Sequence, residues 1–172
     1  MPDDLRTITI DAETALAHAP PGHKDDLRLW LRLLTCTTLI EGEIRARLRR
    51  DFDTTLPRFD LMAALDRAGD GVTLGEVSRR MMVSNGNVTG LAARLEAEGL
   101  VTRRVCPGDR RAQLLRLTPK GKRAFARQSA AHEGWIAGLL GGLGDAESAA
   151  LFRLLGRTKN SVRAALPQEG LA

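Results

Sequence analysis

Residues 84 to 89 carry small polar side chains that could hydrogen-bond to the edges of DNA bases. Ser84, Asn85, Asn87 and Thr89 all lie in this run. In a major groove an amide can pair bidentately with adenine, and a hydroxyl suits either kind of base. A helix that begins at Ser84 would present these side chains to a groove. We predict base contact by at least one of Asn85, Asn87 and Thr89, and helix capping is the alternative role for Ser84 and Asn85.

Arginines gather further along the chain, where they could bind the phosphate backbone. Residues 103–111 hold four basic side chains and one acid: Arg103, Arg104, Arg110, Arg111 and Asp109. The whole chain has a net charge of +5 and a pI near 10.0, which favours a polyanionic partner. We expect Arg94, Arg103 and Arg104 to contact phosphates. Arg110, at the tip of a predicted turn, is suited to a narrow minor groove.

Asp109 would place a negative charge beside DNA, which is unfavourable unless it holds an arginine in position. We predict that it pairs with Arg79, Arg80 or Arg111. The role of an ordinary turn residue is equally compatible with its place in the sequence.

Two short helices are expected to hold the polar run. The first follows Thr73, whose hydroxyl can cap it, and Glu76 is placed to reach back to the cap. The second follows Ser84 and ends at Gly99, where Leu100 can close the helix end. Its apolar positions recur at helical spacing on one side: Val88, Leu91, Ala92 and Leu95.

A charged β-hairpin is expected to hold the arginines. Its strands are predicted at residues 101–106 and 112–117, joined by a turn at 107–110 that contains proline and glycine. Val72 could add a short strand beside it. Alternation predicts four side chains that face inward: Val101, Val105, Leu115 and Leu117. The helix pair and the hairpin together predict a winged helix-turn-helix.

Apolar helices are expected on both sides of this unit. Residues 25–50 repeat apolar side chains at helical spacing on two faces, and a break at 53–57 precedes a shorter helix at 59–68. A helix after Thr118 is expected to end at the glycines of 141–144, and Asp145 to cap a last helix.

The predicted fold class is therefore mainly α (α+β), with three regions. Residues 53–117 form the winged helix-turn-helix, and residues 25–52 and 118–166 form a helical dimerisation region. Residues 1–24, rich in proline and glycine near their end, are expected to form an N-terminal arm.

The composition argues against several other classes of protein. Aromatic residues make up 3% of the chain and tyrosine is absent, which disfavours binding of single strands by base stacking. Two distant cysteines and three scattered histidines predict neither a disulfide framework nor a metal site. No secretion signal or membrane-length apolar run is present, so we expect a cytoplasmic protein without a membrane partner. No catalytic motif or phosphate-binding loop is present, so we expect neither enzymatic activity nor a cofactor.

These segments resemble the MarR family of bacterial transcriptional regulators. The resemblance covers about residues 27–166 and rests on residues 83–89, 91–95 and 98–101, on Asp-Arg-Arg at 109–111, and on Leu-Thr-Pro-Lys-Gly at 117–121. It implies an obligate homodimer that binds a double-stranded, pseudo-palindromic operator and acts on transcription, most simply as a repressor. It also implies release from DNA by a small ligand or by oxidation.

The same resemblance implies a sensor pocket between the long first helix, the second helix and the dimer helices. The matching positions are Trp30, Leu34, Thr37, Arg58, Phe59 and Met62. Arg58 could meet a carboxylate or phosphate, whereas core packing is the alternative for Phe59 and Met62. Residues 59–65 and 85–89 resemble members that control the catabolism of aromatic compounds. We therefore expect an aromatic acid or its coenzyme A thioester as effector.

Two alternatives remain open. The first is a redox switch at Cys36, since peroxide-sensing regulators share this fold. Those regulators rely on tyrosine partners, and this chain has no tyrosine. The mid-helix position of Cys36 instead predicts a buried, inert thiol. Cys106, in the predicted wing, is more exposed but has no evident resolving partner. The second is an architectural winged-helix protein that binds DNA with little sequence preference.

Overall fold

A computed structural model of the chain describes residues 24–69, 71–81, 85–106 and 109–166, with backbone alone for residues 85, 106 and 109–112. The arm predicted for residues 1–24 lies outside the described residues, apart from Lys24. The chain divides into two compact units, Met1–Trp135 and Ile136–Ala172. Within the described ranges, every helix is too short or too polar to cross a membrane.

The first described helix is α2 (Asp25–Phe52), which matches the long helix predicted from residue 25. It ends where Asp53 adopts a left-handed conformation (φ 48°) and donates its N–H to the carbonyl of Arg49. Its buried positions lie mostly toward its C-terminal end and include Ile44 and Leu48. Toward its N-terminal end, large apolar side chains are exposed in the single chain: Leu27, Leu29, Trp30 and Leu39.

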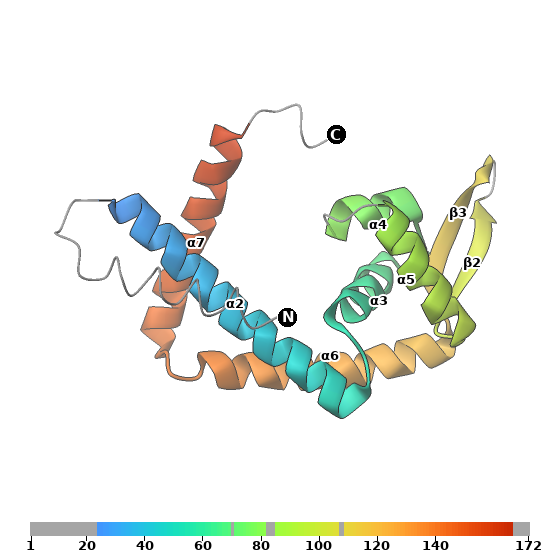
Figure 1. The fold of residues 1–172 in the computed structure, drawn as a ribbon, viewed down its shortest axis with the longest axis horizontal. Helices are drawn as coiled ribbons and strands as arrows, with labels where there is room; N and C mark the ends of the chain where they lie inside the picture. The colour runs from blue at the N-terminus through green and yellow to red at the C-terminus, as the bar shows by residue number, and fades with distance from the viewer. Residues whose placement is uncertain (1–23, 70, 82–84, 107–108, 167–172) are drawn as a thin grey trace. The chain divides into compact units, whose positions relative to one another are not determined.

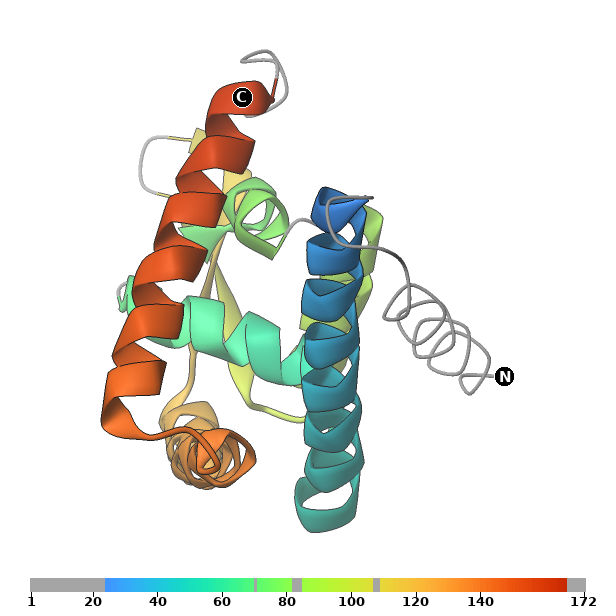
Figure 2. The same cartoon turned by 90° about the vertical axis from the view of Figure 1, so that its left-hand side faces the viewer.

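The central helix of the first unit is α3 (Leu56–Ala68), which crosses α2 in Figure 2. It starts with Pro57 in its first turn, where a missing N–H costs nothing. Its buried side chains lie on several sides: Phe59, Leu61, Met62, Ala64 and Leu65. A helix buried on several sides has little amphipathic character, which explains the weak apolar periodicity of this segment.

The predicted helix pair is present as α4 (Leu74–Met81) and α5 (Asn85–Ala97). The cap predicted at Thr73 is confirmed, because its hydroxyl oxygen accepts a hydrogen bond from the Glu76 N–H at 3.3 Å. The Glu76 carboxylate pairs with Arg80, one turn later on the same helix. Val88, Ala92 and Leu95 form the buried side of α5, as predicted, and Leu91 is half-buried.

The C-terminal end of α5 is closed by the motif predicted for Gly99 and Leu100. Gly99 has a positive φ of 70°, which favours glycine. Its N–H donates to the carbonyl of Glu96, and the N–H of Leu100 donates to that of Leu95, both at 2.9 Å. This pair of bonds is the Schellman motif, in which carbonyls at a helix end find donors beyond it.

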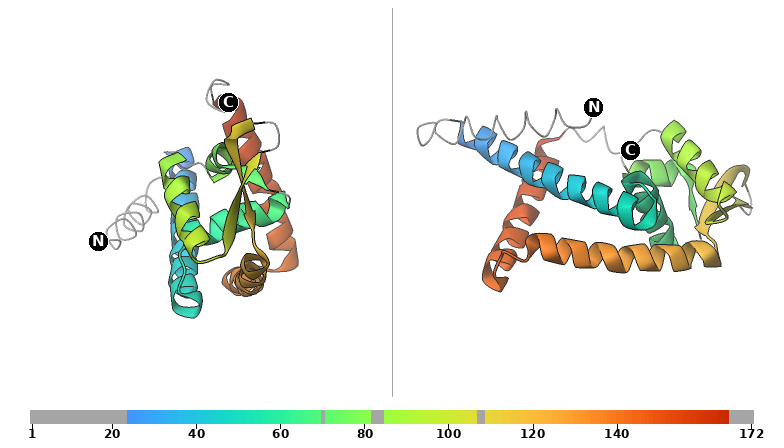
Figure 3. Two further views of the ribbon diagram at one scale, coloured as in Figure 1. Left: turned by 90° about the vertical axis from the view of Figure 1, so that its right-hand side faces the viewer. Right: turned by 60° about the horizontal axis from the view of Figure 1, so that its bottom comes forward.

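The sheet has three antiparallel strands in the order β1 (Val72–Thr73), β3 (Asp109–Leu117), β2 (Val101–Cys106). The short strand predicted at Val72 is confirmed by its pairing with Leu115. Figure 3 shows the twisted β2–β3 hairpin. The second hairpin strand begins at Asp109 and not at residue 112 as predicted, because the ladder continues past a register shift until Cys106 pairs with Asp109.

One predicted core position in the hairpin is wrong. Val101, Leu115 and Leu117 are buried, but Val105 is 58% exposed. Val105 lies in the distal half of the hairpin, which extends beyond the helices in Figure 1. Alternation along a strand fixes the side to which a side chain points, and at this position that side faces solvent.

The two last helices are α6 (Pro119–Leu140) and α7 (Asp145–Ala165). The cap predicted at Thr118 is confirmed, because its hydroxyl oxygen accepts the Gly121 N–H at 3.0 Å. The cap predicted at Asp145 is wrong, since Gly144 precedes the helix and donates its N–H to the Glu147 carboxylate at 2.8 Å. In the second unit, α7 exposes several large apolar side chains: Leu151, Phe152, Leu154, Leu155 and Val162.

Candidate nucleic-acid interface and adjoining cleft

In the first turns of α5, polar side chains lie on the exposed side of the helix and apolar side chains on the buried side. Asn87 and Thr89 are exposed, whereas Val88 is fully buried between them. Asn85 is the first residue of the helix, and its side chain, like the whole of Ser84, lies outside the description. The structure therefore brings Asn87 and Thr89 to the surface of the helix that was predicted to read bases.

A groove of about 360 Å³ runs along this face, lined by Met81 of α4 and by Gly86, Asn87, Gly90 and Arg94 of α5, among others. A Cβ atom built at Gly86 or at Gly90 would meet no described atom within 4 Å. These two glycines leave the backbone of α5 open on this side. A nucleic acid could therefore approach it closely.

The arginines predicted to contact phosphates differ in their surroundings. Arg94 and Arg104 are exposed. Arg103 is 22% exposed, forms an ion pair with Glu96 at 2.8 Å and donates to Gln113 at 3.4 Å. Arg103 would have to leave Glu96 to reach a phosphate, so Arg94 and Arg104 are better placed for that role.

The residues predicted at the wing, Asp109, Arg110 and Arg111, open strand β3. Their side chains lie outside the description, and with them the ion pair predicted for Asp109. Of the partners proposed for it, Arg80 already pairs with Glu76.

The end of α5 is bonded to the first turn of α6. The Lys120 ammonium donates to the carbonyl of Glu98 at 2.8 Å, and the Thr118 hydroxyl donates to the carbonyl of Gly99 at 2.7 Å. The Thr118 N–H donates to the carbonyl of Leu100 at 3.0 Å. We call these three bonds the α5–α6 clamp. They satisfy the consecutive carbonyls of residues 98–100, which follow the last residue of α5.

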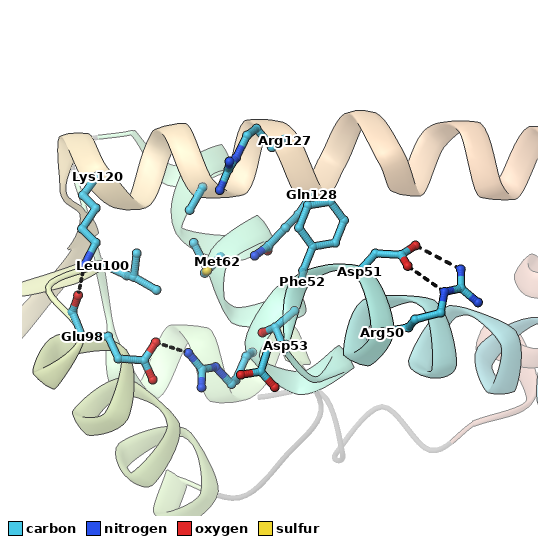
Figure 4. A pocket seen from close by; sticks show the side chains of 13 residues that line it. Arg50, Asp51, Phe52, Asp53, Met62, Glu98, Leu100, Lys120, Arg127 and Gln128 are labelled. Carbon is cyan, nitrogen blue, oxygen red and sulfur yellow. Dashed lines mark hydrogen bonds and ion pairs between the residues drawn. The ribbon is translucent and has the colours of Figure 1, made fainter.

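A cleft of about 790 Å³ lies beside this clamp (Figure 4). We call it the clamp cleft. Its walls come from the end of α2, the start of α3, the end of α5 and the first half of α6. The charged or polar residues that line it are Arg50, Asp51, Asp53, Thr54, Arg58, Glu98, Lys120, Arg127 and Gln128.

Ion pairs join some of these charges. Arg58 of α3 pairs with Glu98 at the end of α5, and Arg50 donates to Asp51 at 2.7 and 3.1 Å. The latter pair holds the pKa of Asp51 below its ordinary value. Two buried atoms, Nε of Arg58 and Oε1 of Gln128, have no hydrogen-bond partner within the described ranges.

The structure brings together two of the six side chains predicted for the ligand pocket. Arg58 and Met62 line the clamp cleft. Trp30, Leu34 and Thr37 lie on α2, away from this cleft: Trp30 is 57% exposed, Leu34 is half-buried, and the exposed Thr37 donates its hydroxyl to a backbone carbonyl of α2.

Phe59, the sixth of these side chains, is buried on another side of α3. Its ring stacks on the His132 ring with centroids 4.9 Å apart, and its centroid lies 5.5 Å from that of Phe125. Packing therefore accounts for the burial of Phe59.

The neighbouring residue of α3, Asp60, has a perturbed carboxyl group. Partial desolvation raises the pKa of this carboxyl above its ordinary value, and the negative charge of Glu41 adds to the rise.

Sequence reasoning missed the contribution of Glu98, Lys120 and Gln128 to the cleft. Glu98 and Lys120 fall in motifs that carried the family resemblance, but nothing in their spacing indicated a shared site. Arg58 and Glu98 are 40 positions apart, and only the packing of α3 against α5 brings them together. Gln128 had no signal beyond its place on one face of a predicted helix.

Comparison with known proteins gives consistent matches. A family model described as MarR family matches residues 52–112. The transcriptional activatory protein BadR of Rhodopseudomonas palustris is 30% identical over 100 residues, a match that spans 57% of this chain and just over half (57%) of BadR.

Two solved structures resemble most of this chain. A MarR family transcriptional regulator from Silicibacter pomeroyi is 30% identical, with 83% of this chain and 99% of that chain covered and a TM-score of 0.70. BpsR of Bordetella bronchiseptica, whose DNA binding is regulated by 6-hydroxynicotinic acid, is 26% identical, with 77% and 98% covered and a TM-score of 0.67.

Proposed function

Because this chain belongs to the MarR family of transcriptional regulators, we propose that it binds a pseudo-palindromic operator as a homodimer and represses transcription until an aromatic acid or its coenzyme A thioester releases it. The observation that carries the proposal is the exposed polar face of α5 beside a basic hairpin. Asn87 and Thr89 would contact bases, with Asn85 and Ser84 at the start of the helix. Arg94 and Arg104 would contact phosphates, and Arg110 and Arg111 would lie at the wing.

Exposed apolar side chains support the homodimer. Leu29 and Trp30 are exposed on α2, and Phe152 and Leu155 are exposed on α7 in the second unit. Large apolar surfaces in a soluble protein usually mark an interface. Residues 25–52 and 118–166 would supply it. A twofold axis would then place two copies of α5 about 34 Å apart, one turn of DNA.

The effector is proposed to be a small organic acid. BpsR, which shares 26% identity over most of this chain, responds to 6-hydroxynicotinic acid, a hydroxylated aromatic acid. The clamp cleft supplies cationic side chains at which a carboxylate could bind. A coenzyme A thioester has no free carboxylate, so its phosphates would be the groups that meet these cations.

Operator binding can be tested by selecting sequences from random DNA and measuring their affinity in a gel shift at fixed salt. We expect a palindromic consensus bound at least ~10³-fold more tightly than random DNA. Aromatic acids or their coenzyme A thioesters should then release the complex. A ratio near one would instead identify an architectural DNA-binding protein, and the absence of release by both ligand classes would contradict the proposed effector.

A second candidate, regulation by oxidation, is favoured by one observation. Cys36 is exposed in the structure, so the prediction of a buried thiol is wrong. The prediction rested on the position of Cys36 in the middle of an apolar helix, but its side of α2 is not covered by other described residues of the chain. An exposed thiol can be reached by peroxide.

We nevertheless expect dilute peroxide to leave operator binding unchanged, because peroxide-sensing regulators of this fold rely on tyrosine partners and this chain contains no tyrosine. The measurement compares gel shifts of the wild-type protein and a Cys36→Ser variant before and after peroxide. Loss of binding in the wild type alone, reversed by a reductant, would place the switch at Cys36.

A further inference from the structure

One inward-facing position of the hairpin holds a charged side chain. Alternation along β2 puts Arg103 on the same side of the strand as Val101 and Val105. Exposure on this side rises toward the tip of the hairpin: Val101 is 2% exposed, the Arg103 side chain 22% and Val105 58%. Arg103 therefore lies at the point where the hairpin leaves the cover of the helices.

The Arg103 side chain contacts three elements. Its Nε atom lies 2.8 Å from Oε2 of Glu96, in the last turn of α5, and its Nη1 atom donates to Oε1 of Gln113, on β3, at 3.4 Å. Gln113 is the diagonal neighbour of Arg103 across the ladder, because Arg103 pairs with Leu115. A single side chain thus links the recognition helix to both strands of the hairpin.

The contact between Arg103 and Glu96 depends on charge more than on hydrogen-bond direction. Nε of Arg103 is buried and has no hydrogen-bond partner among the described residues, although the Glu96 carboxylate lies close to it. The Glu96 side chain is 42% exposed, and an ion pair this close to solvent contributes about 1 kcal/mol or less to folding. Its effect on folding is therefore small, whereas its effect on the angle between α5 and the hairpin can be large. Cys106, three residues further along β2, lies about 10 Å away at the usual strand rise.

We propose that Arg103 is a positioning residue, which holds the hairpin against Glu96 so that the wing and the polar face of α5 contact the same duplex. Arg103 acts through Arg110, at the start of β3, and binds no phosphate itself while the ion pair is intact. This role differs from the phosphate contact expected from the sequence. It rests on the proposed function, because it assigns the residue that aligns the two parts of the DNA interface.

The experiment compares the affinity for the selected operator with that for random DNA of equal length, by gel shift at fixed salt. Arg103→Gln and Glu96→Gln should each lower the ratio of the two affinities by roughly tenfold, and the double variant should lower it no further, since both changes break one contact. The ratio is the useful quantity because a change of net charge alters binding to both DNAs alike.

Arg104→Gln is the matched control, with the same change of charge on the next residue of β2, which is exposed. As a phosphate contact, Arg104 should lower both affinities together and leave their ratio unchanged. If Arg103 also bound phosphate, Arg103→Gln would behave in this way. Glu96→Gln would then release Arg103 and tighten binding to both DNAs.

A second comparison separates positioning from a merely structural role. Arg110→Ala should weaken operator binding by at least ~30-fold in the wild type but by less than ~3-fold in the Arg103→Gln background, because the displaced wing no longer makes its contact. A residue that only stabilised the fold would leave the effect of Arg110→Ala unchanged. Without DNA, amide hydrogen exchange in residues 101–106 should be faster in Arg103→Gln and Glu96→Gln than in the wild type.

Four outcomes would overturn the proposal. They are an unchanged affinity ratio in Arg103→Gln, tighter operator binding in Glu96→Gln, an undiminished effect of Arg110→Ala in the Arg103→Gln background, and hydrogen exchange equal to that of the wild type. Equal affinity of the wild-type protein for operator and random DNA would contradict the proposed function instead. The exchange measurement without DNA would still decide whether Arg103 and Glu96 hold the hairpin.

Discussion

A Gly121→Ala variant is expected to be less stable than the wild-type protein by about 3 kcal/mol or more. A Cβ atom at this position would lie 2.0 Å from the carbonyl oxygen of Leu100 and 2.9 Å from its carbonyl carbon. Both are backbone atoms that the α5–α6 clamp holds in place, since Leu100 accepts the Thr118 N–H. A flexible side chain could move aside, but this backbone cannot move without breaking the clamp.

The change in stability can be measured by urea unfolding followed by circular dichroism. Gly134→Ala is the matched control, because it lies on the same helix and its Cβ would meet no described atom within 4 Å. Alanine there should raise stability by up to about 1 kcal/mol, as expected in a helix interior. Equal unfolding midpoints for Gly121→Ala and wild type would show that α6 does not pack on Leu100 as described.

An Arg110→Ala variant is expected to lose at least ~30-fold in operator affinity while it remains dimeric. Arg110 is the second residue of β3, at the start of the returning strand of the hairpin. An arginine that enters a minor groove contributes about 1–3 kcal/mol, and a dimer loses the contact twice. The measurement is a gel shift with the selected operator at two salt concentrations, with size-exclusion chromatography to check assembly.

Arg157→Ala is the control, since it removes the same charge from an exposed position of α7. It should change operator affinity little, because α7 belongs neither to the helix pair nor to the hairpin that are proposed to contact DNA. Unchanged affinity in Arg110→Ala at both salt concentrations would remove the wing from the proposed interface.

Local signals in the sequence predicted the boundaries of several elements. Thr73 and Thr118 were expected to cap helices, and each hydroxyl accepts the N–H three residues later. Gly99 with Leu100 was expected to end α5, and the Schellman bonds are present. Caps and helix ends are decided by neighbours along the chain, so they can be predicted without knowledge of the tertiary structure.

The predictions that failed depended on contacts with residues that are distant in the sequence. Val105 has the right alternation, but the helices do not extend far enough to cover it. Cys36 lies in an apolar stretch, but it is exposed in the single chain. A period fixes the direction of a side chain, and it does not fix how far the core reaches.

The clamp cleft could not be predicted from the sequence for the same reason. The polar face of α5 could be predicted because it lies within one helix. The cleft needs Arg58 of α3, Glu98 from the turn after α5 and Gln128 of α6, which come together only in the folded chain. No spacing in the sequence predicts that these residues lie together. The two cleft atoms without a hydrogen-bond partner among the described residues, Nε of Arg58 and Oε1 of Gln128, can be found only when the burial of each atom is known.

The bonds between the end of α5 and the first turn of α6 also bear on the thermodynamics of DNA recognition. A helix whose last carbonyls lack donors frays, and ordering each frayed residue against DNA costs about 1–2 kcal/mol of conformational entropy. In this protein the carbonyls of Arg94, Leu95 and Glu96 accept the N–H groups of residues 98–100. Lys120 and Thr118 then hold the carbonyls of Glu98 and Gly99, just beyond the end of α5. Less conformational entropy is then lost when the protein binds DNA. If α5 contacts an operator as proposed, it does so as a pre-organised surface, and the entropy of association is correspondingly less unfavourable.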